Sequence, residues 1–349
     1  MNSSLAVLQS FPVPRSTTNP YLVQLARGLR KLPGVTVVNF SWRVALLGKY
    51  DVFHVHWPEI LVSGHSPLKK LVRQVLTLAL LCRLALTKTP IVRTIHNIEL
   101  PKDISVLEVL LLRLVDRRTT LYIRLNSETP LPTDRPSTII PHGHYRDWFH
   151  DFPKTEKIPG RIGYVGLIRR YKGVEDLIQA FRETTKAHPE LSLRLGGNPS
   201  TPELGEKIAA LSRGDARIRL NLDYVSDAEL VDTITSSELV VLPYRFMHNS
   251  GGALAALSLD RPVLVPANEV NQALSEEVGP GWVFQYTGAL TPESILRTLA
   301  SLAAQGPRTR PDLRRRDWHE GSLAHKEAYE QALAPDAGHA TVLEKAVRP

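Results

Sequence analysis

Short apolar runs alternate with stretches of helical periodicity along nearly the whole chain, and this alternation restricts the possible folds more than any other feature. Each run is four to six residues long, is rich in Val, Ile and Leu, and lacks apolar–polar alternation, which is typical of a strand buried on both faces. The expected strands are residues 5–9, 35–40, 52–56, 91–95, 120–124, 138–141, 161–165, 192–195, 217–221, 239–242, 262–265 and 281–284. Strands that alternate with helices imply parallel sheets covered by helices, so the chain is expected to be of the α/β class.

Twelve strands are too many for one ordinary sheet, and 349 residues are more than one typical domain needs. A stretch of Pro, His and charged residues at 142–157 separates the two halves. We therefore predict two Rossmann-like, doubly wound domains that face each other across a cleft, at residues 1–150 and 151–318. The remainder, 319–349, is expected to hold a helix that returns to the first domain, followed by a loose tail.

Charge is unevenly distributed along the chain. Residues 1–150 contain 19 Lys and Arg against nine Asp and Glu, whereas the rest contains 24 against 26. This asymmetry indicates an anionic partner for the first half, such as a phosphorylated substrate or an acidic membrane surface. Nucleic acid is not expected, because no nucleic-acid-binding motif is present. The single cysteine, Cys82, excludes a disulfide framework, and residues 1–10 do not resemble a signal peptide, so we expect a cytoplasmic protein.

Residues 66–88 form an apolar segment with helical signals, but Arg73 and Arg83 flank its centre and the uninterrupted apolar part is too short to span a bilayer. One interpretation is a helix, or a pair of helices, packed on the first sheet. The other is a basic amphipathic surface on anionic lipid, which would direct cations toward phosphate. Those cations are Lys69, Lys70, Arg73, Arg83 and Lys88.

Two glycine-containing segments in the second half are suited to binding an anion. Residues 163–173, with Arg169 and Lys172, follow an expected strand and precede a helix, and so do residues 243–252. Glycine lets the backbone approach an anion, a helix start offers unpaired N–H groups, and the cations add charge. A plain glycine turn and a plain helix cap remain as simpler interpretations. Two such segments in one domain favour a diphosphate, which has two ends to hold.

The order of these segments, with Gly-Gly-Asn at 196–198 and Arg-Pro-Val at 261–263, resembles the C-terminal domain of GT-B glycosyltransferases. The first half agrees through His-Val-His-Trp-Pro-Glu at 54–59, His-Asn-Ile-Glu at 96–99 and Pro-His-Gly-His-Tyr at 141–145. Together these motifs, which extend over residues 5 to 290, resemble bacterial enzymes of exopolysaccharide assembly. Among those enzymes the likeness is to GDP-mannose:glycolipid 4-β-mannosyltransferases.

This resemblance implies a nucleotide-sugar donor in the second domain and an acceptor in the first. The donor-binding residues that it implies are Gly166, Arg169, Lys172, Asn198, Tyr224, Val225, Tyr244, Asn249, Ser250 and Gly251. The candidates for the catalytic base are Glu59, His96, His56 and Glu99. A carboxylate that caps a helix is an alternative role for Glu59, and a satisfied strand-end histidine is one for His56.

The chain departs from large retaining GT-B families, which carry two glutamates eight positions apart before the Pro-Val strand. Counting back from Pro262, those positions hold Met247 and Ala255, which favours an inverting reaction. No Asp-x-Asp is present, so we expect no metal or other cofactor, with Arg169 and Lys172 neutralising the departing diphosphate.

The resemblance thus implies transfer of a hexose, mannose from GDP-mannose, to a lipid-linked saccharide at the inner face of the membrane. Two alternatives are a retaining enzyme with a small soluble acceptor and a non-catalytic nucleotide-sugar-binding protein. An epimerase of the same fold is a further possibility, but no residue specifically indicates it.

Overall fold

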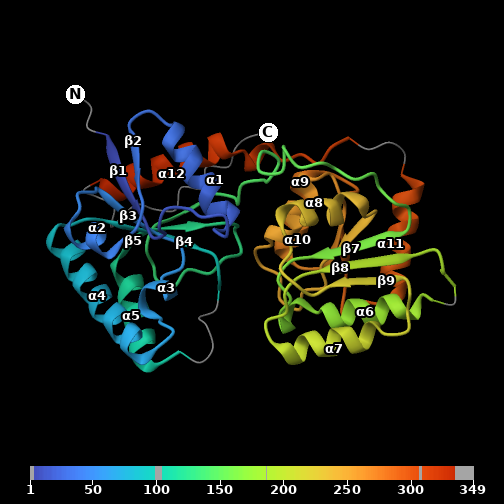
Figure 1. Ribbon diagram of the computed structural model, residues 1–349. Coiled ribbons are helices and arrows are strands. Elements are labelled where there is room, and N and C mark those ends of the chain that lie inside the picture. Colours follow the sequence, from blue (N-terminus) through green and yellow to red (C-terminus); the bar gives the residue numbers. More distant parts are fainter. Residues whose placement is uncertain (1–3, 99–103, 186, 306–308, 335–349) are drawn as a thin grey trace. The chain divides into compact units, whose positions relative to one another are not determined.

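The computed structural model describes residues 4–98, 104–185, 187–305 and 309–334, and it contains two α/β units. The first unit comprises Met1–Gly143 and Arg315–Pro349, and the second comprises His144–Arg314. Each unit is built on one six-stranded sheet in which neighbouring strands run parallel (Figure 1). The predicted α/β class with two doubly wound sheets is confirmed, and a strand lies at each of the twelve expected places.

The first sheet has the strand order β2-β1-β3-β4-β5-β6. Its strands are β1 (Leu5–Gln9), β2 (Val35–Val38), β3 (Val52–Val55), β4 (Ile91–Ile95), β5 (Thr119–Arg124) and β6 (Ser137–Ile139). The order reverses direction between β1 and β3, and ligands of such sheets bind beyond the carboxyl ends of the strands at a reversal of this kind.

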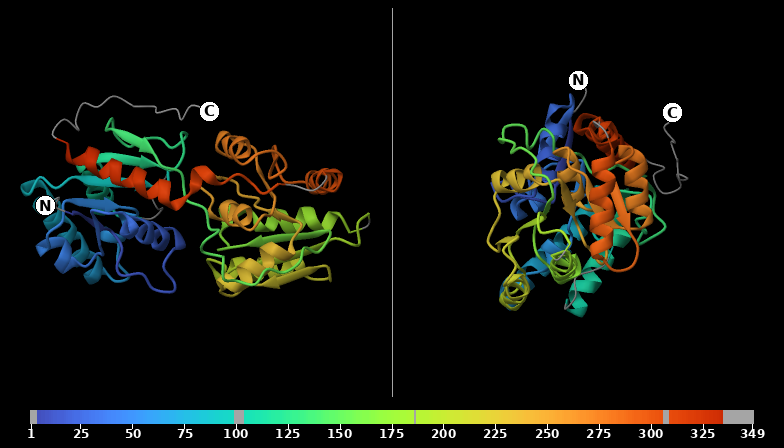
Figure 2. Two further views of the ribbon diagram at one scale, coloured as in Figure 1. Left: turned by 90° about the horizontal axis from the view of Figure 1, so that it is seen from above. Right: turned by 90° about the vertical axis from the view of Figure 1, so that its right-hand side faces the viewer.

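Helices cover both faces of the first sheet. They are α1 (Pro20–Lys31), α2 (Trp42–Leu47), α3 (Glu59–Val62), α4 (Pro67–Leu86), α5 (Val106–Arg118) and α12 (Trp318–Leu333). Helices α1 and α12 pack together on one face, and α2, α4 and α5 cover the other (Figures 1 and 2). Val7 therefore joins the core under α1 and α12, whereas its neighbour Leu8 joins the core under α2 and α4. Burial of successive residues explains why the strands lack apolar–polar alternation.

The second sheet has the order β12-β11-β10-β7-β8-β9, which reverses between β7 and β10. Its strands are β7 (Arg161–Val165), β8 (Ser192–Gly196), β9 (Ile218–Asn221), β10 (Leu239–Val241), β11 (Val263–Pro266) and β12 (Val283–Tyr286). Its helices are α6 (Val174–Glu183), α7 (Pro202–Ser212), α8 (Asp227–Ser236), α9 (Gly251–Ser258), α10 (Glu269–Val278) and α11 (Pro292–Ala304). Helices α6 and α7 lie on one face, and α8 and α9 lie on the other (Figure 1).

The two units divide between Gly143 and His144, before the expected boundary at residue 150. The reason is that Tyr145 and Phe149 are buried in the core of the second unit. The chain rejoins the first unit at Arg315, and α12 places Tyr329 in that unit's core. The expected loose tail, residues 335–349, lies outside the described residues.

Residues 66–88 contain a single helix, α4, rather than a pair of helices. Ser66 caps its start by accepting a hydrogen bond from the backbone N–H of Lys69, and Pro67 occupies the first turn. Leu80, Leu81 and Leu84 are buried against the sheet. Within the described part of the chain, no helix has both the length and the apolar character needed to cross a membrane.

Candidate functional site

The loop after β7 carries Gly166, Arg169 and Lys172. Gly166 has a φ of +138°, and a Cβ there would lie 3.8 Å from Nζ of Lys172, so the glycine leaves open backbone beside the ammonium. Lys172 is half-buried with Nζ 4.9 Å from the centre of the Tyr244 ring, whereas Arg169 is exposed. Burial, and secondly the charge of Arg169, lower the pKa of Lys172 to about 8. The loop thus holds two cations with different degrees of hydration.

The loops after β7 and β8 are bound to each other. The backbone N–H of Gly166 donates to the carbonyl of Gly196 at 3.0 Å, and that of Ile168 donates to the carbonyl of Asn198 at 3.1 Å. A Cβ on Gly197 would lie 1.9 Å from the carbonyl oxygen of Gly166, so only glycine permits this approach. The side chain of Asn198 is exposed beside the loop that carries Arg169.

The loop after β10 is bound to the same region. Its Arg245 donates from the backbone N–H to the carbonyl of Tyr171 at 2.8 Å, and its guanidinium pairs with Asp176 at 3.2 Å. Ser250 caps α9 by accepting a hydrogen bond from the N–H of Ala253 at 3.1 Å. The backbone N–H groups of the first turn of α9 therefore lie at the same edge of the sheet as Arg169 and Lys172.

The structure thus brings together eight expected donor-binding residues at the carboxyl ends of β10, β7 and β8, where the strand order reverses. They are Gly166, Arg169, Lys172, Asn198, Tyr244, Asn249, Ser250 and Gly251. The other two, Tyr224 and Val225, lie beyond β9, farther along the sheet. Tyr224 is 69% exposed, and Val225 lines a cavity of about 90 Å³ with Gly196 and Asn221.

The histidine candidates of the first unit lie together at the ends of β3 and β4. Nδ1 of His56 is 3.2 Å from Nε2 of His96, and the Trp57 ring stacks on His96 with centroids 4.1 Å apart. His54 and His56 are buried, whereas His96 is half-buried. Burial is the main cause that lowers the pKa of all three rings well below the usual histidine value, and neighbouring histidines add to it. All three imidazoles are therefore neutral at pH 7.

Sequence reasoning missed Gln9 and Tyr329, whose buried side chains lie within hydrogen-bond distance of these histidines. Oε1 of Gln9 lies 3.1 Å from Nε2 of His56, and the Tyr329 hydroxyl lies 2.8 Å from Nδ1 of His54. A polar residue that ends an otherwise apolar strand was the available signal for Gln9. No local signal could identify Tyr329, which is 275 positions from His54.

The two glutamate candidates differ from the histidines in their setting. Glu59 begins α3, which has no side-chain cap, so the structure does not give it the alternative capping role. Its Oε2 is buried without a hydrogen-bond partner, and its charge acts on buried Arg93, which pairs with Asp116. Glu99 lies outside the described residues.

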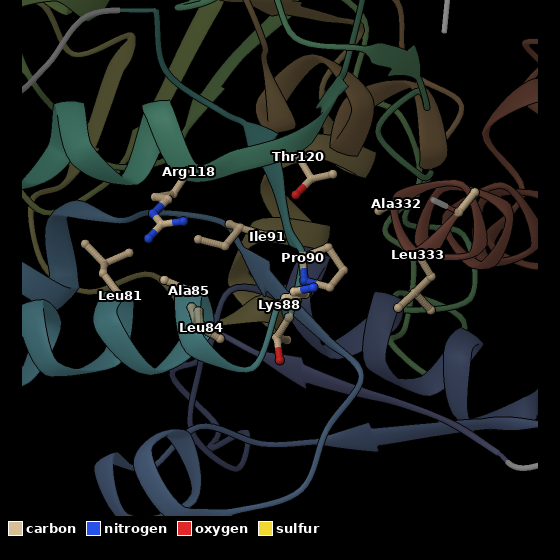
Figure 3. Close-up of a pocket in the computed structure, with 12 residues that line it drawn as sticks. Leu81, Leu84, Ala85, Lys88, Pro90, Ile91, Arg118, Thr120, Ala332 and Leu333 are labelled. Carbon is tan, nitrogen blue, oxygen red and sulfur yellow. The ribbon is translucent and has the colours of Figure 1, made fainter. Parts of the chain in front are cut away.

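A cavity of about 510 Å³ lies elsewhere in the first unit. It is lined by the carboxyl end of α4 with Lys88, by Ile91 at the start of β4, by Arg118 at the end of α5, by Thr120 in β5, and by the end of α12 (Figure 3). His96 follows the opposite end of β4, and no histidine lines this cavity, so it is separate from the histidine cluster. Across the described ranges, no three His, Cys, Asp or Glu side chains are grouped as metal ligands would be.

Comparison with known proteins shows the family to which this chain belongs. Residues 159–303 match the family described as "Glycosyl transferases group 1". A GDP-mannose:glycolipid 4-beta-D-mannosyltransferase of Xanthomonas campestris pv. campestris is 44% identical over 332 residues, which cover 95% of this chain and 94% of that protein.

Two solved structures share the fold. Sucrose-phosphate synthase from Thermosynechococcus elongatus has a TM-score of 0.61 and 13% identity, over 94% of this chain and 98% of that chain. The trehalose-6-phosphate structure from E. coli bound with UDP-2-fluoro glucose has a TM-score of 0.61 and 8% identity, over 94% and 99%. The protein is thus a glycosyltransferase of GT-B fold, and it belongs to the family of the Xanthomonas mannosyltransferase.

Proposed function

We propose that the enzyme transfers mannose from GDP-mannose to a lipid-linked saccharide, with inversion to a β-mannoside, during assembly of a bacterial exopolysaccharide. The observation that carries this proposal is the 44% identity, over 95% of the chain, to a GDP-mannose:glycolipid 4-beta-D-mannosyltransferase. In the proposed reaction the second unit binds the nucleotide-sugar, and the first unit binds the acceptor and supplies the base.

The edge of the second sheet supports the proposed donor site. Arg169 and Lys172 supply positive charge, and the first turn of α9 after Ser250 supplies backbone N–H donors. These groups suit the two phosphates of a nucleoside diphosphate and would neutralise the charge that develops on it as it leaves. We therefore propose that the reaction needs no metal ion.

His96 is the proposed base. It is neutral at pH 7 because of its lowered pKa, it is only half-buried, unlike His54 and His56, and Trp57 and His56 fix its ring. It would take the proton of the acceptor hydroxyl while that oxygen attacks the anomeric carbon. The bond from that carbon to the diphosphate oxygen breaks, and its electron pair leaves with GDP. Glu59 is less suited to this role because its Oε2 is buried beside Arg93.

The second unit supports inversion. Met247 and Ala255 stand where retaining families carry glutamates, and both side chains are buried among apolar residues of the core. No carboxylate is therefore present at either position to assist a retaining reaction, and direct displacement by the acceptor hydroxyl is the simpler chemistry.

The proposed location is the anionic inner face of the membrane, and exposed apolar side chains on two adjacent helices support it. This α4–α5 apolar face consists of Leu68, Leu71, Val72, Val75, Leu78 and Leu86 of α4 and Val106, Leu107 and Leu110 of α5. Such a surface is suited to the boundary between headgroups and acyl chains.

The cations of residues 66–88 differ from the interpretation in which all five point toward phosphate. Lys70 pairs with Glu108, Arg73 donates to the carbonyl of Ser63 at 2.7 Å, and Arg83 donates to the carbonyl of Ala45 at 3.1 Å. These three side chains make contacts within the unit. Lys69 and Lys88 remain exposed and are available to anionic lipid.

A thermal-shift screen with GDP, UDP, ADP and their hexose derivatives tests the donor. A ligand at about 100 times its Kd stabilises the folded state by about 2.7 kcal/mol, so the preferred nucleotide gives the largest rise in Tm. We expect GDP and GDP-mannose to give that rise, and a larger rise with UDP or ADP derivatives would overturn the assignment. Binding of GDP-mannose without transfer to any glycolipid acceptor would favour a non-catalytic binding protein.

A further inference from the structure

We propose that Gln9 is a positioning residue that sets the tautomers of His56 and His96, so that Nδ1 of His96 is the atom that accepts the proton. The proposal rests on the role of His96 as the base. Gln9 ends β1, is fully buried, and lies where the strand order of the first sheet reverses.

Two hydrogen bonds connect Gln9 to His96 through His56. Oε1 of Gln9 lies 3.1 Å from Nε2 of His56, and an amide oxygen only accepts hydrogen bonds, so His56 carries its proton on Nε2. The other nitrogen of His56, Nδ1, must then accept. It lies 3.2 Å from Nε2 of His96, which therefore donates. Because a neutral imidazole has one N–H, the lone pair of His96 is on Nδ1.

A second series of hydrogen bonds begins at the amide nitrogen of Gln9. Its Nε2 donates to the Tyr329 hydroxyl at 3.4 Å, and that hydroxyl donates to Nδ1 of His54 at 2.8 Å. Nε2 of His54 then donates to Oγ1 of Thr94, also at 2.8 Å. The structure places the amide nitrogen of Gln9 toward Tyr329 on α12 and its oxygen toward His56, and every donor in the series then meets an acceptor. The reversed amide would reverse the series and put the proton on Nδ1 of His96.

The hydrogen bonds that join His96, His56 and Gln9 also stabilise the protonated form of His96. When Nδ1 of His96 gains the acceptor proton, its Nε2–H still donates to His56, whose own N–H donates to Gln9. These aligned hydrogen bonds stabilise the imidazolium without a second proton transfer. The other titratable groups that face the pair come from α1, β3, β4, the loop after β6 and α12. They are Tyr21, His54, Arg93, His142, His325 and Tyr329.

Three variants of the full-length enzyme test the kinetic consequence. Gln9→Met removes both polar atoms, and we expect kcat to fall about tenfold or more while KM for GDP-mannose stays within about twofold. Gln9→Glu keeps an acceptor toward His56, and its negative charge favours the protonated histidines, so the acidic limb of the kcat profile moves to higher pH. Gln24→Met is the matched control, because Gln24 is also buried in the first unit but its amide makes no hydrogen bond.

The decisive measurement is independent of turnover. Long-range ¹H–¹⁵N NMR of the histidine side chains, with the His96 signals identified by their loss in His96→Gln, reports which ring nitrogen carries the proton. We expect Nε2–H on His96 in the native protein and in Gln9→Glu, and loss of that preference in Gln9→Met. If Gln9→Met does not fold, Tyr329→Phe, which removes the hydroxyl that orients the amide, should weaken the same preference.

The possible results distinguish the proposed role of Gln9 from the proposed role of His96 as the base. A proton on Nδ1 of native His96, or an Nε2–H preference that persists in both Gln9→Met and Tyr329→Phe, would overturn the role of Gln9. The expected tautomers together with an undiminished kcat in His96→Gln would instead remove His96 as the base, while the effect of Gln9 on the ring would stand.

Discussion

Individual side chains determine what the enzyme can do with a nucleotide, and the fold holds the two key cations differently. Arg169 is exposed, whereas Lys172 is half-buried over Tyr244 and has a pKa lowered to about 8. An arginine stays charged at any ordinary pH, but this lysine loses its charge near the upper end of the physiological range. The two residues should therefore contribute differently to the pH dependence of donor binding.

Donor affinity should fall as pH rises through about 8, because Lys172 is a cation below its pKa and neutral above it. We expect KM for GDP-mannose to rise between about pH 7 and about pH 9, and Lys172→Arg to make the profile nearly flat. Lys172→Ala should weaken binding about tenfold or more at pH 7, since a hydrogen bond to a charged group contributes about 1.5–3 kcal/mol. Arg170→Ala, which changes an exposed neighbour, is the control. Unchanged affinity in both Lys172→Ala and Arg169→Ala would contradict the proposed diphosphate site.

The proposed base is tested by comparing His96 with Glu59. We expect His96→Ala to lower kcat by a factor of about 10² to 10⁴ without changing the rise in Tm that GDP produces, because the proposed GDP site is in the other unit. His65→Ala, which alters an exposed histidine of the first unit, should leave kcat unchanged. If Glu59→Gln abolishes turnover while His96→Ala retains it, the base is Glu59.

Among the structural elements, α4 shows most clearly what its sequence determines. Ser66, Pro67 and the leucine pattern predicted a helix, and the helix forms. Which cations it presents depends on partners far along the chain, since Arg83 donates to the carbonyls of Ala45 and Gly48. Sequence patterns therefore predicted the element but not which of its cations stay exposed.

The α4–α5 apolar face should bind anionic vesicles. The triple variant Leu71→Ser, Val75→Ser and Leu78→Ser removes three side chains that are each about half-exposed, and each would contribute about 1 kcal/mol on entering lipid. We expect a loss of binding to phosphatidylglycerol vesicles of at least about tenfold in a sedimentation assay. Ile158→Ser, in the second unit, is the control. Equal vesicle binding by native protein and triple variant would exclude this surface.

The end of α6 shows why the sequence does not predict where every helix ends. The helical period of the sequence continues over 174–188, but α6 ends at Glu183. The guanidinium of Arg217, which precedes β9, donates to the carbonyl of His188 at 2.9 Å and to Oγ1 of Thr185 at 2.6 Å. These bonds hold Thr185 and His188 in the segment that follows the helix. A helical period cannot predict such an ending, because the competing donor is 29 positions away.

For the molecule as a whole, the sequence predicted two doubly wound sheets with functional residues at their carboxyl ends, because buried parallel strands and glycine-rich loops have local signals. It did not predict the histidine network, whose donors and acceptors come from β1, β3, β4 and α12. The hydrogen bond between Gln9 and Tyr329 joins residues 320 positions apart. The first unit thus acquires its complete network only when the end of the chain returns to it.

The configuration of the product, and the rate at which it forms without metal ions, depend on every part of the proposed function. Full-length enzyme is incubated with GDP-mannose and a lipid-linked saccharide acceptor in the presence of EDTA, and NMR of the product gives the configuration of the new linkage. We predict a β-mannoside, formed at the same rate with and without the chelator. An α-mannoside, or turnover that stops in EDTA and returns with Mg²⁺ or Mn²⁺, would contradict an inverting transfer in which Arg169, Lys172 and backbone N–H groups neutralise the departing GDP.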